Sequence, residues 1–198
     1  MARRDHDDRR DELLAAVREL CAEQGADRFS VSAVTERVGV TRSLFYHYFP
    51  DREAALDAAL DGVIEDAMAR IRAWNNAREP GDIEGALESC AELFRSIVLE
   101  DGLPTSLLTS GNSALFTAYL HRIADRVACF MRDNTARDFE ARHGMPIDHV
   151  YETFYVLVVG LAMYVRMHPD APVETIRDVA ASTLHLEGFL GGCPKPGA

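Results

Sequence analysis

Apolar residues recur along the chain with the spacing of amphipathic helices. The first stripe lies in about residues 8–24, where Leu13, Val17, Leu20 and Cys21 fall on one face of a 3.6-residue period. No segment of the sequence alternates between apolar and polar residues like a half-buried strand, and the sequence has no internal repeat. The pattern therefore predicts an all-α fold.

Glycines, prolines and capping residues divide the chain into about nine predicted helices. Ser30, Thr41 and Asp51 are the expected N-caps of the second, third and fourth helices, and Gly39 closes the second. The second and third cover about 31–38 and 42–49, and the fourth keeps one face apolar as far as Trp74. The others are predicted at about 83–99, 104–110, 113–142, 147–167 and 173–189.

This organisation predicts an N-terminal three-helix domain at 1–52 and a C-terminal helical bundle at 53–190, followed by a disordered tail at 191–198. The chain has 198 residues and 47% hydrophobic content, enough to bury a core. Residues 1–11 are charged, with no apolar stretch behind them, and do not resemble a signal peptide. The longest apolar run, 154–165, is shorter than a bilayer-spanning helix. We expect a cytoplasmic protein with no membrane partner.

The net charge of −11 is unevenly distributed along the chain. Residues 1–56 carry 9 arginines and 11 acidic residues, whereas residues 57–198 carry 12 basic and 21 acidic residues. Salt screens charges beyond about 10 Å, so a nearly neutral head can bind phosphate if its arginines share one face. We hypothesise that the acidic body suppresses non-specific binding to nucleic acid.

Residues 30–52 have the pattern of two short helices joined by a tight turn, for which Gly39 supplies the reversal. A helix as short as 42–49 does not stand alone in water and must be packed against its neighbours. Phe45 and Phe49 lie on the face predicted to be buried. The outward face then consists of Arg42, Ser43, Tyr46 and His47. Such groups hydrogen-bond phosphates and base edges.

The end of this stretch resembles the helix-turn-helix of the TetR family of repressors. It reads Gly39-Val40-Thr41-Arg42-Ser43-Leu44-Phe45-Tyr46-His47-Tyr48-Phe49-Pro50-Asp51-Arg52-Glu53. The family's pattern is close to Gly-Val-Ser-x-Gly-x-Leu-Tyr-x-His/Tyr-Phe-x-x-Lys-Glu. Ser43 stands in place of the usual glycine, and Arg52 in place of the usual lysine. The strong match covers about residues 10–56, and beyond them only the length and the helix count match.

The resemblance implies a double-stranded DNA operator as partner and a role for each residue of the motif. Arg42 and Ser43 would reach base edges in the major groove, with Arg42 best suited to guanine. Tyr46 would hydrogen-bond a phosphate, and His47 would contact a phosphate or a base edge. The other expected backbone contacts are Ser30, Ser32, Thr41 and Arg52, the last at a helix start that also favours an anion.

Two parts of this interface remain open. Leu44 could pack on a thymine methyl group or lie idle at the edge of the groove. The basic residues of the N-terminal arm and of the following turn could bind DNA, or could belong to a solvated end of mixed charge. These residues are Arg3, Arg4, Arg9, Arg10 and Arg28.

The predicted helix at 147–167 is apolar nearly all round, so one of its faces needs a partner, which we expect to be a second copy of the chain. The resemblance implies a homodimer whose interface comes from the last two helices of each subunit. Its expected residues are Val158, Gly160, Ile176, Val179, Ala180, Thr183 and Leu184. Such a dimer would space two recognition helices by about 34 Å or a multiple, so the operator should be a near-palindrome.

The resemblance also implies a small, largely apolar effector bound within the C-terminal domain. The expected lining residues are Met68, Phe94, Phe116, Tyr119, Leu120, His121, Tyr151, Tyr155 and Met163. Aromatic and methionine stripes at helical spacing also build ordinary cores, which is the alternative at each of these positions. The effector would shift the dimer away from its DNA-binding conformation through the fourth helix.

Two other functions remain open: a regulator whose C-terminal domain binds a protein or no ligand, and a metal enzyme built on a helical bundle. A di-iron bundle needs two Glu-x-x-His motifs and two more carboxylates, and the sequence has one such motif, Glu140–His143. It has no glycine-rich phosphate loop and no nucleophile motif. We therefore expect no enzymatic activity and no metal or other cofactor.

The cysteines lie far apart and form no Cys-x-x-Cys pair. Their neighbours are apolar helix positions, so we interpret them as small buried apolar residues, with a redox switch as the alternative. They are Cys21, Cys90, Cys129 and Cys193.

Overall fold

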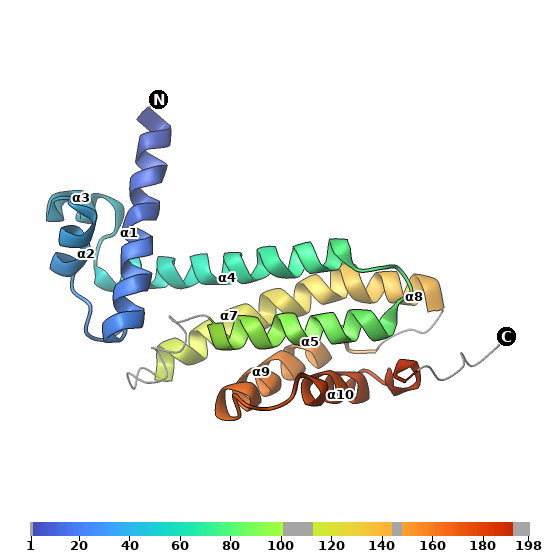
Figure 1. Cartoon of the computed structure of the whole chain (residues 1–198). Helices are drawn as coiled ribbons and strands as arrows, with labels where there is room; N and C mark the ends of the chain where they lie inside the picture. Colours follow the sequence, from blue (N-terminus) through green and yellow to red (C-terminus); the bar gives the residue numbers. More distant parts are fainter. Residues whose placement is uncertain (1, 101–112, 144–147, 192–198) are drawn as a thin grey trace. The chain divides into compact units, whose positions relative to one another are not determined.

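The computed structural model describes residues 2–100, 113–143 and 148–191, and every regular element in these ranges is helical (Figure 1), as predicted. The α-helices are α1 (Ala2–Gln24), α2 (Val31–Val38), α3 (Arg42–Tyr48), α4 (Arg52–Ala77), α5 (Ile83–Glu100), α7 (Ser113–Phe130), α8 (Arg137–His143), α9 (Val150–Met167) and α10 (Val173–Thr183). A π-helical turn, Met131–Ala136, lies between α7 and α8, and a 3-10 turn, Glu187–Phe189, follows α10.

These elements pack as two compact units. The N-terminal unit contains the chain up to Asp66 and, among the described residues, 113–119. The C-terminal unit contains 67–100 and the described residues from Leu120 onward. Helices α4 and α7 therefore contribute residues to both units. The functional boundaries at 52/53 and 190/191 stay predictions, and residues 192–198 of the tail lie outside the described residues.

In the N-terminal unit α1 packs against α2, and α2 against α3 (Figure 1). The apolar stripe of α1 is buried as predicted, since Leu13, Val17 and Cys21 have no exposed surface and Leu20 is 2% exposed. Burying a side chain of this kind contributes about 1.5–3 kcal/mol. The helix begins at Ala2, earlier than the predicted start at residue 8.

All three predicted N-caps are confirmed. The Ser30 and Thr41 hydroxyls each accept a hydrogen bond of 3.2 Å, from the N–H groups of Ala33 and Leu44, and Asp51 accepts one of 2.7 Å from Ala54. Each cap satisfies a backbone donor that the first turn of a helix leaves without a partner. The start of every helix from α2 to α4 is thus set by a local side chain.

The turn between α2 and α3 requires glycine. Gly39 has φ +72°, a left-handed conformation that costs little only without a Cβ atom. It allows the N–H of Gly39 to bond the Glu36 carbonyl, and that of Val40 to bond the Thr35 carbonyl at 2.9 Å. These two bonds satisfy carbonyls at the end of α2 and reverse the chain into α3.

Helix α1 is also tied to the middle of α4. Arg18 Nη1 lies 2.7 Å from Asp66 Oδ2, and the guanidinium reaches it by crossing over Gly62. A Cβ atom at position 62 would lie 1.7 Å from Arg18 Nη2. The missing side chain at Gly62 therefore makes room for this ion pair.

In the C-terminal unit α5 packs against α9 and α10, and α10 also packs against α9. One core cluster contains Ala91, Leu161, Val165 and Ile176, with Phe94 packed against it. A second lies near the end of α10, and a third joins Phe154 of α9 to the π turn.

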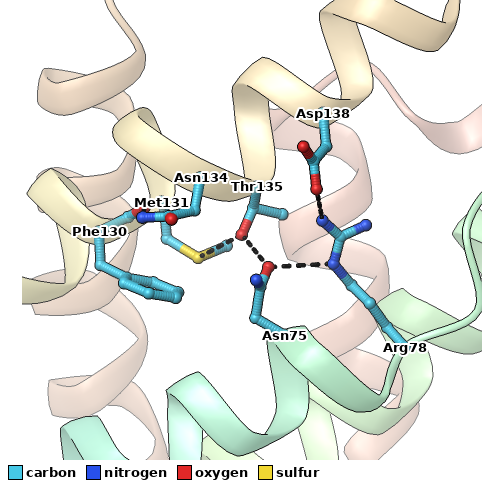
Figure 2. Close-up of polar contacts among 7 residues, drawn as sticks. All are labelled: Asn75, Arg78, Phe130, Met131, Asn134, Thr135 and Asp138. Atoms are coloured by element: carbon cyan, nitrogen blue, oxygen red, sulfur yellow. Dashed lines mark hydrogen bonds and ion pairs between the residues drawn. The ribbon is translucent and has the colours of Figure 1, made fainter.

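The predicted single helix at 113–142 is wrong in its middle, where the chain forms the π turn Met131–Ala136 (Figure 2). The Asn134 side-chain amide donates to the Phe130 carbonyl at 2.9 Å, and Thr135 Oγ1 donates to Asn75 Oδ1 of α4 at 2.9 Å. Short polar side chains of this kind compete with the regular α-helical hydrogen bonds. Arg78 donates to the same Asn75 oxygen at 3.0 Å and pairs with Asp138 at 2.6 Å.

The last predicted helix, 173–189, ends early, at Thr183. His185 takes the left-handed conformation with φ +57°, and the Leu186 N–H reaches back to the Ala181 carbonyl at 2.7 Å. Leu186 then packs with Ala181 and Ile83. This is a helix-ending motif that usually carries glycine where His185 stands, so the sequence pattern did not predict it. The preceding helix begins at Val150 instead of 147, and the predicted helix at 104–110 lies outside the described residues.

Helix α9 is long and apolar enough, by length and composition alone, to cross a membrane, with a mean hydropathy of 1.3. One such helix is weak evidence, because core helices of soluble proteins pass the same test. Only 22% of this helix is buried inside the chain.

The cysteines that the structure describes fit the apolar interpretation to different degrees. Cys21 is buried, Cys90 and Cys129 are half-buried, and all three are free thiols. Burial raises the pKa of Cys21 to about 12, against an opposing effect of the Arg52 charge, and raises that of Cys90 to about 11. Cys193 lies outside the described residues.

Replacing Phe45 should destabilise the N-terminal unit, because its ring has no exposed surface. We expect Phe45→Ala to lower the free energy of unfolding by about 3–5 kcal/mol in urea denaturation followed by circular dichroism. The matched control is Tyr46→Ala at the adjacent position, whose side chain is 53% exposed and whose loss should cost less than about 1 kcal/mol. Equal losses for the two variants would contradict this packing.

Cys21 should be inert in the native chain, because the thiolate is the reactive form. Iodoacetamide at pH 8 should leave Cys21 unmodified in the native protein and alkylate it after denaturation, as read by peptide mass spectrometry. Since the folded pKa is raised, the thiol's contribution to stability is present below its ordinary pKa and declines as the pH rises from about 9 towards 12. Rapid native labelling of Cys21 would favour the redox alternative.

Candidate nucleic-acid interface

Helix α3 presents one polar face to solvent. Phe45 and Phe49 are buried beneath it, with ring centroids 5.4 Å apart. The opposite face carries Arg42, Ser43, Tyr46 and His47, all exposed. The rings of Tyr46 and Phe45 make a T-shaped contact with centroids 5.5 Å apart, while Tyr46 is 53% exposed. The predicted division of α3 into a buried and an exposed face is confirmed.

The starts of α2 and α3 lie together. Arg42 Nη2 donates a hydrogen bond to Ser32 Oγ, which brings two predicted DNA-contacting side chains into contact. Ser30 and Thr41 are exposed, and each uses its side-chain oxygen as an N-cap. Polar groups from two short helices therefore form one continuous surface.

Three of the predicted contact residues, Ser32, Leu44 and Arg52, are half-buried, whereas the others are exposed. Partial burial of Leu44 is compatible with both predicted alternatives, contact with a thymine methyl group and an idle position at the edge of the groove. The Arg52 guanidinium bonds backbone carbonyls of its own chain, at Phe29 and Ala26, a contact that the sequence pattern did not predict.

Other arginines of the N-terminal unit also bind within the protein. Arg37 makes a two-bond contact with Glu23, at 2.9 and 2.8 Å, and lies 3.4 Å from Glu19. The hydrogen bond to Arg37 holds the pKa of Glu23 below its usual range. Arg10 of the N-terminal arm lies over the Phe49 ring, 5.5 Å from its centroid. Arg10 is therefore next to the end of α3.

Four polar and aromatic residues of α7 and α9 are connected by hydrogen bonds and ring stacking. Tyr151 donates to Asp125 Oδ1 at 2.7 Å, a bond that raises the pKa of Tyr151 to about 12. His121 Nδ1 lies 2.8 Å from the Tyr155 hydroxyl, and the Tyr151 and Tyr155 rings stack at 6.0 Å. Three predicted ligand-lining residues are thus brought together, with Asp125 as a member that the sequence analysis missed.

The other predicted lining residues do not join this group. Phe94 packs against the core cluster that contains Leu161 and Ile176, and Met163 is exposed on α9. Met68 is buried and Leu120 is half-buried in the C-terminal unit. Phe116 and Tyr119 are buried residues of the N-terminal unit.

Helix α9 carries an exposed apolar stripe at helical spacing. Its members are Val156, Gly160, Met163, Tyr164 and Met167, of which Val156 is 67% and Met167 72% exposed. A Cβ atom at Gly160 would meet no other atom within 4 Å, so another helix could approach closely there.

The predicted dimer residues divide between this outer surface and the core. Gly160 belongs to the stripe, and Val179 of α10 is 42% exposed. Thr183 is exposed, and Val158, Ala180 and Leu184 are half-buried. Ile176 is 1% exposed, and burial in the core of its own chain leaves it almost no surface for a partner.

Among the described residues, no group of three or more His, Cys, Asp or Glu side chains is placed to hold a metal ion. The His143 side chain of the Glu-x-x-His motif lies outside the part whose side chains are described.

A capped three-helix unit with an anchored third helix and an exposed Arg/Ser/Tyr/His face defines a helix-turn-helix domain. Residues 13–59 match the family model of the bacterial regulatory proteins of the tetR family. The regulator EthR of Mycolicibacterium smegmatis is 33% identical over 95 residues, which are 47% of this chain and 42% of EthR. The chain therefore aligns with less than half the length of this curated relative.

Solved structures share the whole fold at lower identity. A TetR-family regulator from Streptomyces coelicolor has a TM-score of 0.65 and 21% identity, over 91% of this chain and 97% of the other. RolR in complex with resorcinol has a TM-score of 0.56 and 21% identity, over 97% and 98% of the two chains. Residues 13–59 thus match the DNA-binding domain of the TetR family, as the resemblance of the third helix indicated, and the solved structures show that the described helices have the fold of such regulators.

Proposed function

We propose that this chain is a transcriptional repressor that binds a near-palindromic DNA operator as a homodimer and leaves it when a small, largely apolar ligand binds. The observation that carries the proposal is the exposed polar face of α3, held in place by Phe45 and Phe49. Arg42 and Ser43 read base edges, and Tyr46 and His47 contact the backbone or a base edge. The starts of α2 and α3 contact phosphates of the DNA backbone through Ser30, Ser32 and Thr41.

The exposed stripe of α9 supports the homodimer. A surface with both Val156 and Met167 mostly in solvent is unusual for a chain that functions alone. A second copy of α9, with Val179 and Thr183 of α10, covers this stripe and gives a two-fold interface. The interface spaces the two α3 helices for a palindromic site in cytoplasmic DNA.

The C-terminal unit is the proposed site of the ligand. The connected tyrosines and His121 offer hydrogen-bonding groups beside apolar helices, the usual composition of a small-molecule site. The related fold of RolR, solved with resorcinol, supports an aromatic compound as the kind of ligand. A ligand that binds more tightly to one arrangement of α4 shifts the population of dimers away from the DNA-binding conformation. The coupling free energy between ligand binding and DNA binding is about 1–3 kcal/mol.

Footprinting on the DNA that flanks the protein's own gene tests the proposal. Two protected half-sites, separated by about one turn of DNA or a multiple, are expected without ligand, and candidate aromatic compounds should weaken the protection. If the protein still protected the DNA fully in the presence of every compound tried, and were a monomer, the result would favour a regulator without a ligand. No retention of any flanking fragment would contradict the function.

Two substitutions in α3 should affect DNA binding differently. Tyr46→Ala should lower affinity for all operator variants, because it removes a backbone contact, whereas Arg42→Ala should mainly weaken the preference for one base pair, by about 1–3 kcal/mol. Gel-shift titration on the footprinted operator and on single-base variants measures both effects. Arg132→Ala, which removes an exposed arginine of the C-terminal unit, is the control and should leave affinity unchanged. Wild-type binding by both α3 variants would rule out the assigned roles.

A charge in the α9 stripe should break the dimer. Met163→Arg places a guanidinium where the partner helix would bury it, at a cost far above that of an exposed charge. Light scattering coupled to size exclusion should report a dimer for the wild type and a monomer for this variant. Glu92→Arg, at an exposed position of α5, is the matched control and should stay dimeric. An unchanged mass for Met163→Arg would place the interface elsewhere.

A further inference from the structure

Arg52, the first residue of α4, uses its guanidinium inside the protein. Its Nε donates to the Phe29 carbonyl at 3.0 Å, and its Nη2 donates to the Ala26 carbonyl. The guanidinium carbon lies 4.4 Å from the centroid of the Phe29 ring, in a cation–π contact. The remaining nitrogen, Nη1, lies 3.3 Å from Glu53. All three nitrogens therefore have partners within the chain.

The carbonyls that Arg52 binds belong to the loop between α1 and α2. Ala26 and Phe29 are buried, with 0% and 2% of their surface exposed. Backbone carbonyls in buried, irregular segments need hydrogen-bond donors, and this loop has no regular helix to supply them. A planar guanidinium can bond two such carbonyls at once while its face stacks on a ring.

The position of this loop decides where α2 begins. Phe29, whose carbonyl Arg52 binds, is followed directly by Ser30, the N-cap of α2. Ser32, one residue into the helix, accepts the hydrogen bond from Arg42 of α3. Arg52 thus connects the start of α4 to the loop that ends at Ser30, where the polar surface of α2 and α3 begins.

We propose that Arg52 is a positioning residue, which fixes the α1–α2 loop and thereby the start of α2 against α4, and that it does not neutralise a DNA phosphate. This inference replaces the phosphate contact that the family resemblance implied for this position. Its effect on operator affinity rests on the proposed DNA-binding function, but its effect on folding does not.

Lysine separates the two roles. A lysine at position 52 keeps the positive charge for a phosphate, but it cannot bond two carbonyls in a fixed plane or stack flat on Phe29. A phosphate contact therefore tolerates Arg52→Lys, and a positioning role does not. Arg52→Met removes the charge and keeps a long apolar stem. Arg37→Lys, at the exposed arginine paired with Glu19 and Glu23, is the matched control.

The experiment measures the melting temperature of each full-length variant and its operator affinity at several salt concentrations below that temperature. Arg52→Lys should lower the melting temperature by a few degrees and weaken affinity about five- to tenfold in the fully folded protein, nearly as much as Arg52→Met. The slope of log affinity against log salt should stay at the wild-type value in both variants. Arg37→Lys should match the wild type in all three measurements.

Three results would overturn the inference. The first is wild-type stability and affinity in Arg52→Lys. The second is a salt slope in Arg52→Met that is smaller by about 0.9 for each arginine removed, the signature of a lost phosphate contact. A loss of melting temperature without any loss of affinity in the folded variant would reduce Arg52 to a structural residue and also overturn it. If the wild type bound no operator, the proposed DNA-binding function would fail. The melting temperatures of Arg52→Lys and Arg52→Met would still test whether Arg52 holds the α1–α2 loop.

Discussion

The burial of two phenylalanines beneath a seven-residue helix is the constraint on which the rest of the N-terminal unit depends. A helix of two turns is unstable in water, because the cost of forming its first turn is recovered only over a longer run of hydrogen bonds. Phe45 and Phe49 supply the missing free energy through burial, and Thr41 and Asp51 fix where α3 and α4 begin. With its backbone fixed in this way, α3 can give its other face entirely to polar side chains.

The arginines of the N-terminal unit are divided between holding the protein and facing solvent. Arg18 binds Asp66 across Gly62, Arg37 binds two glutamates of α1, and Arg52 binds carbonyls of a loop. Arg42 remains on the exposed face of α3. This division explains how an N-terminal head with slightly more acidic than basic residues can still present a local polar surface suited to nucleic acid. Counting charges would have excluded such a role, whereas their placement supports it.

The sequence predicted those features that depend on near neighbours in the chain. The three N-caps, the turn at Gly39 and the two faces of α3 follow from residues within one or two helical turns, and all are confirmed. The π turn and the early end of α10 were missed because Asn134, Thr135 and His185 take roles that composition does not reveal. Asn75, whose oxygen accepts from Thr135, is 60 residues away in the chain.

Long-range packing explains the other differences. Periodicity identifies the apolar face of a helix, but it does not say whether that face meets the chain's own core or a partner. Ile176 was therefore assigned to a dimer surface although it is buried in its own unit, and Met163 was assigned to a ligand site although it lies in the exposed stripe. The Arg52 contacts were missed for the same reason, since they join residues 23 and 26 positions apart.

The π turn has a geometric consequence for everything that follows it in the same helix. A π turn accommodates about one residue more than the α-helical winding that it replaces. Each residue of an α-helix advances by about 100° around the axis, so the side chains of α8 are rotated by about that angle from where uninterrupted winding would place them. Asp138 meets Arg78 in this rotated frame (Figure 2). Deleting one residue between Met131 and Ala136 would restore regular winding and turn that carboxylate away from its arginine, so the length of this segment, as much as its composition, defines the contact.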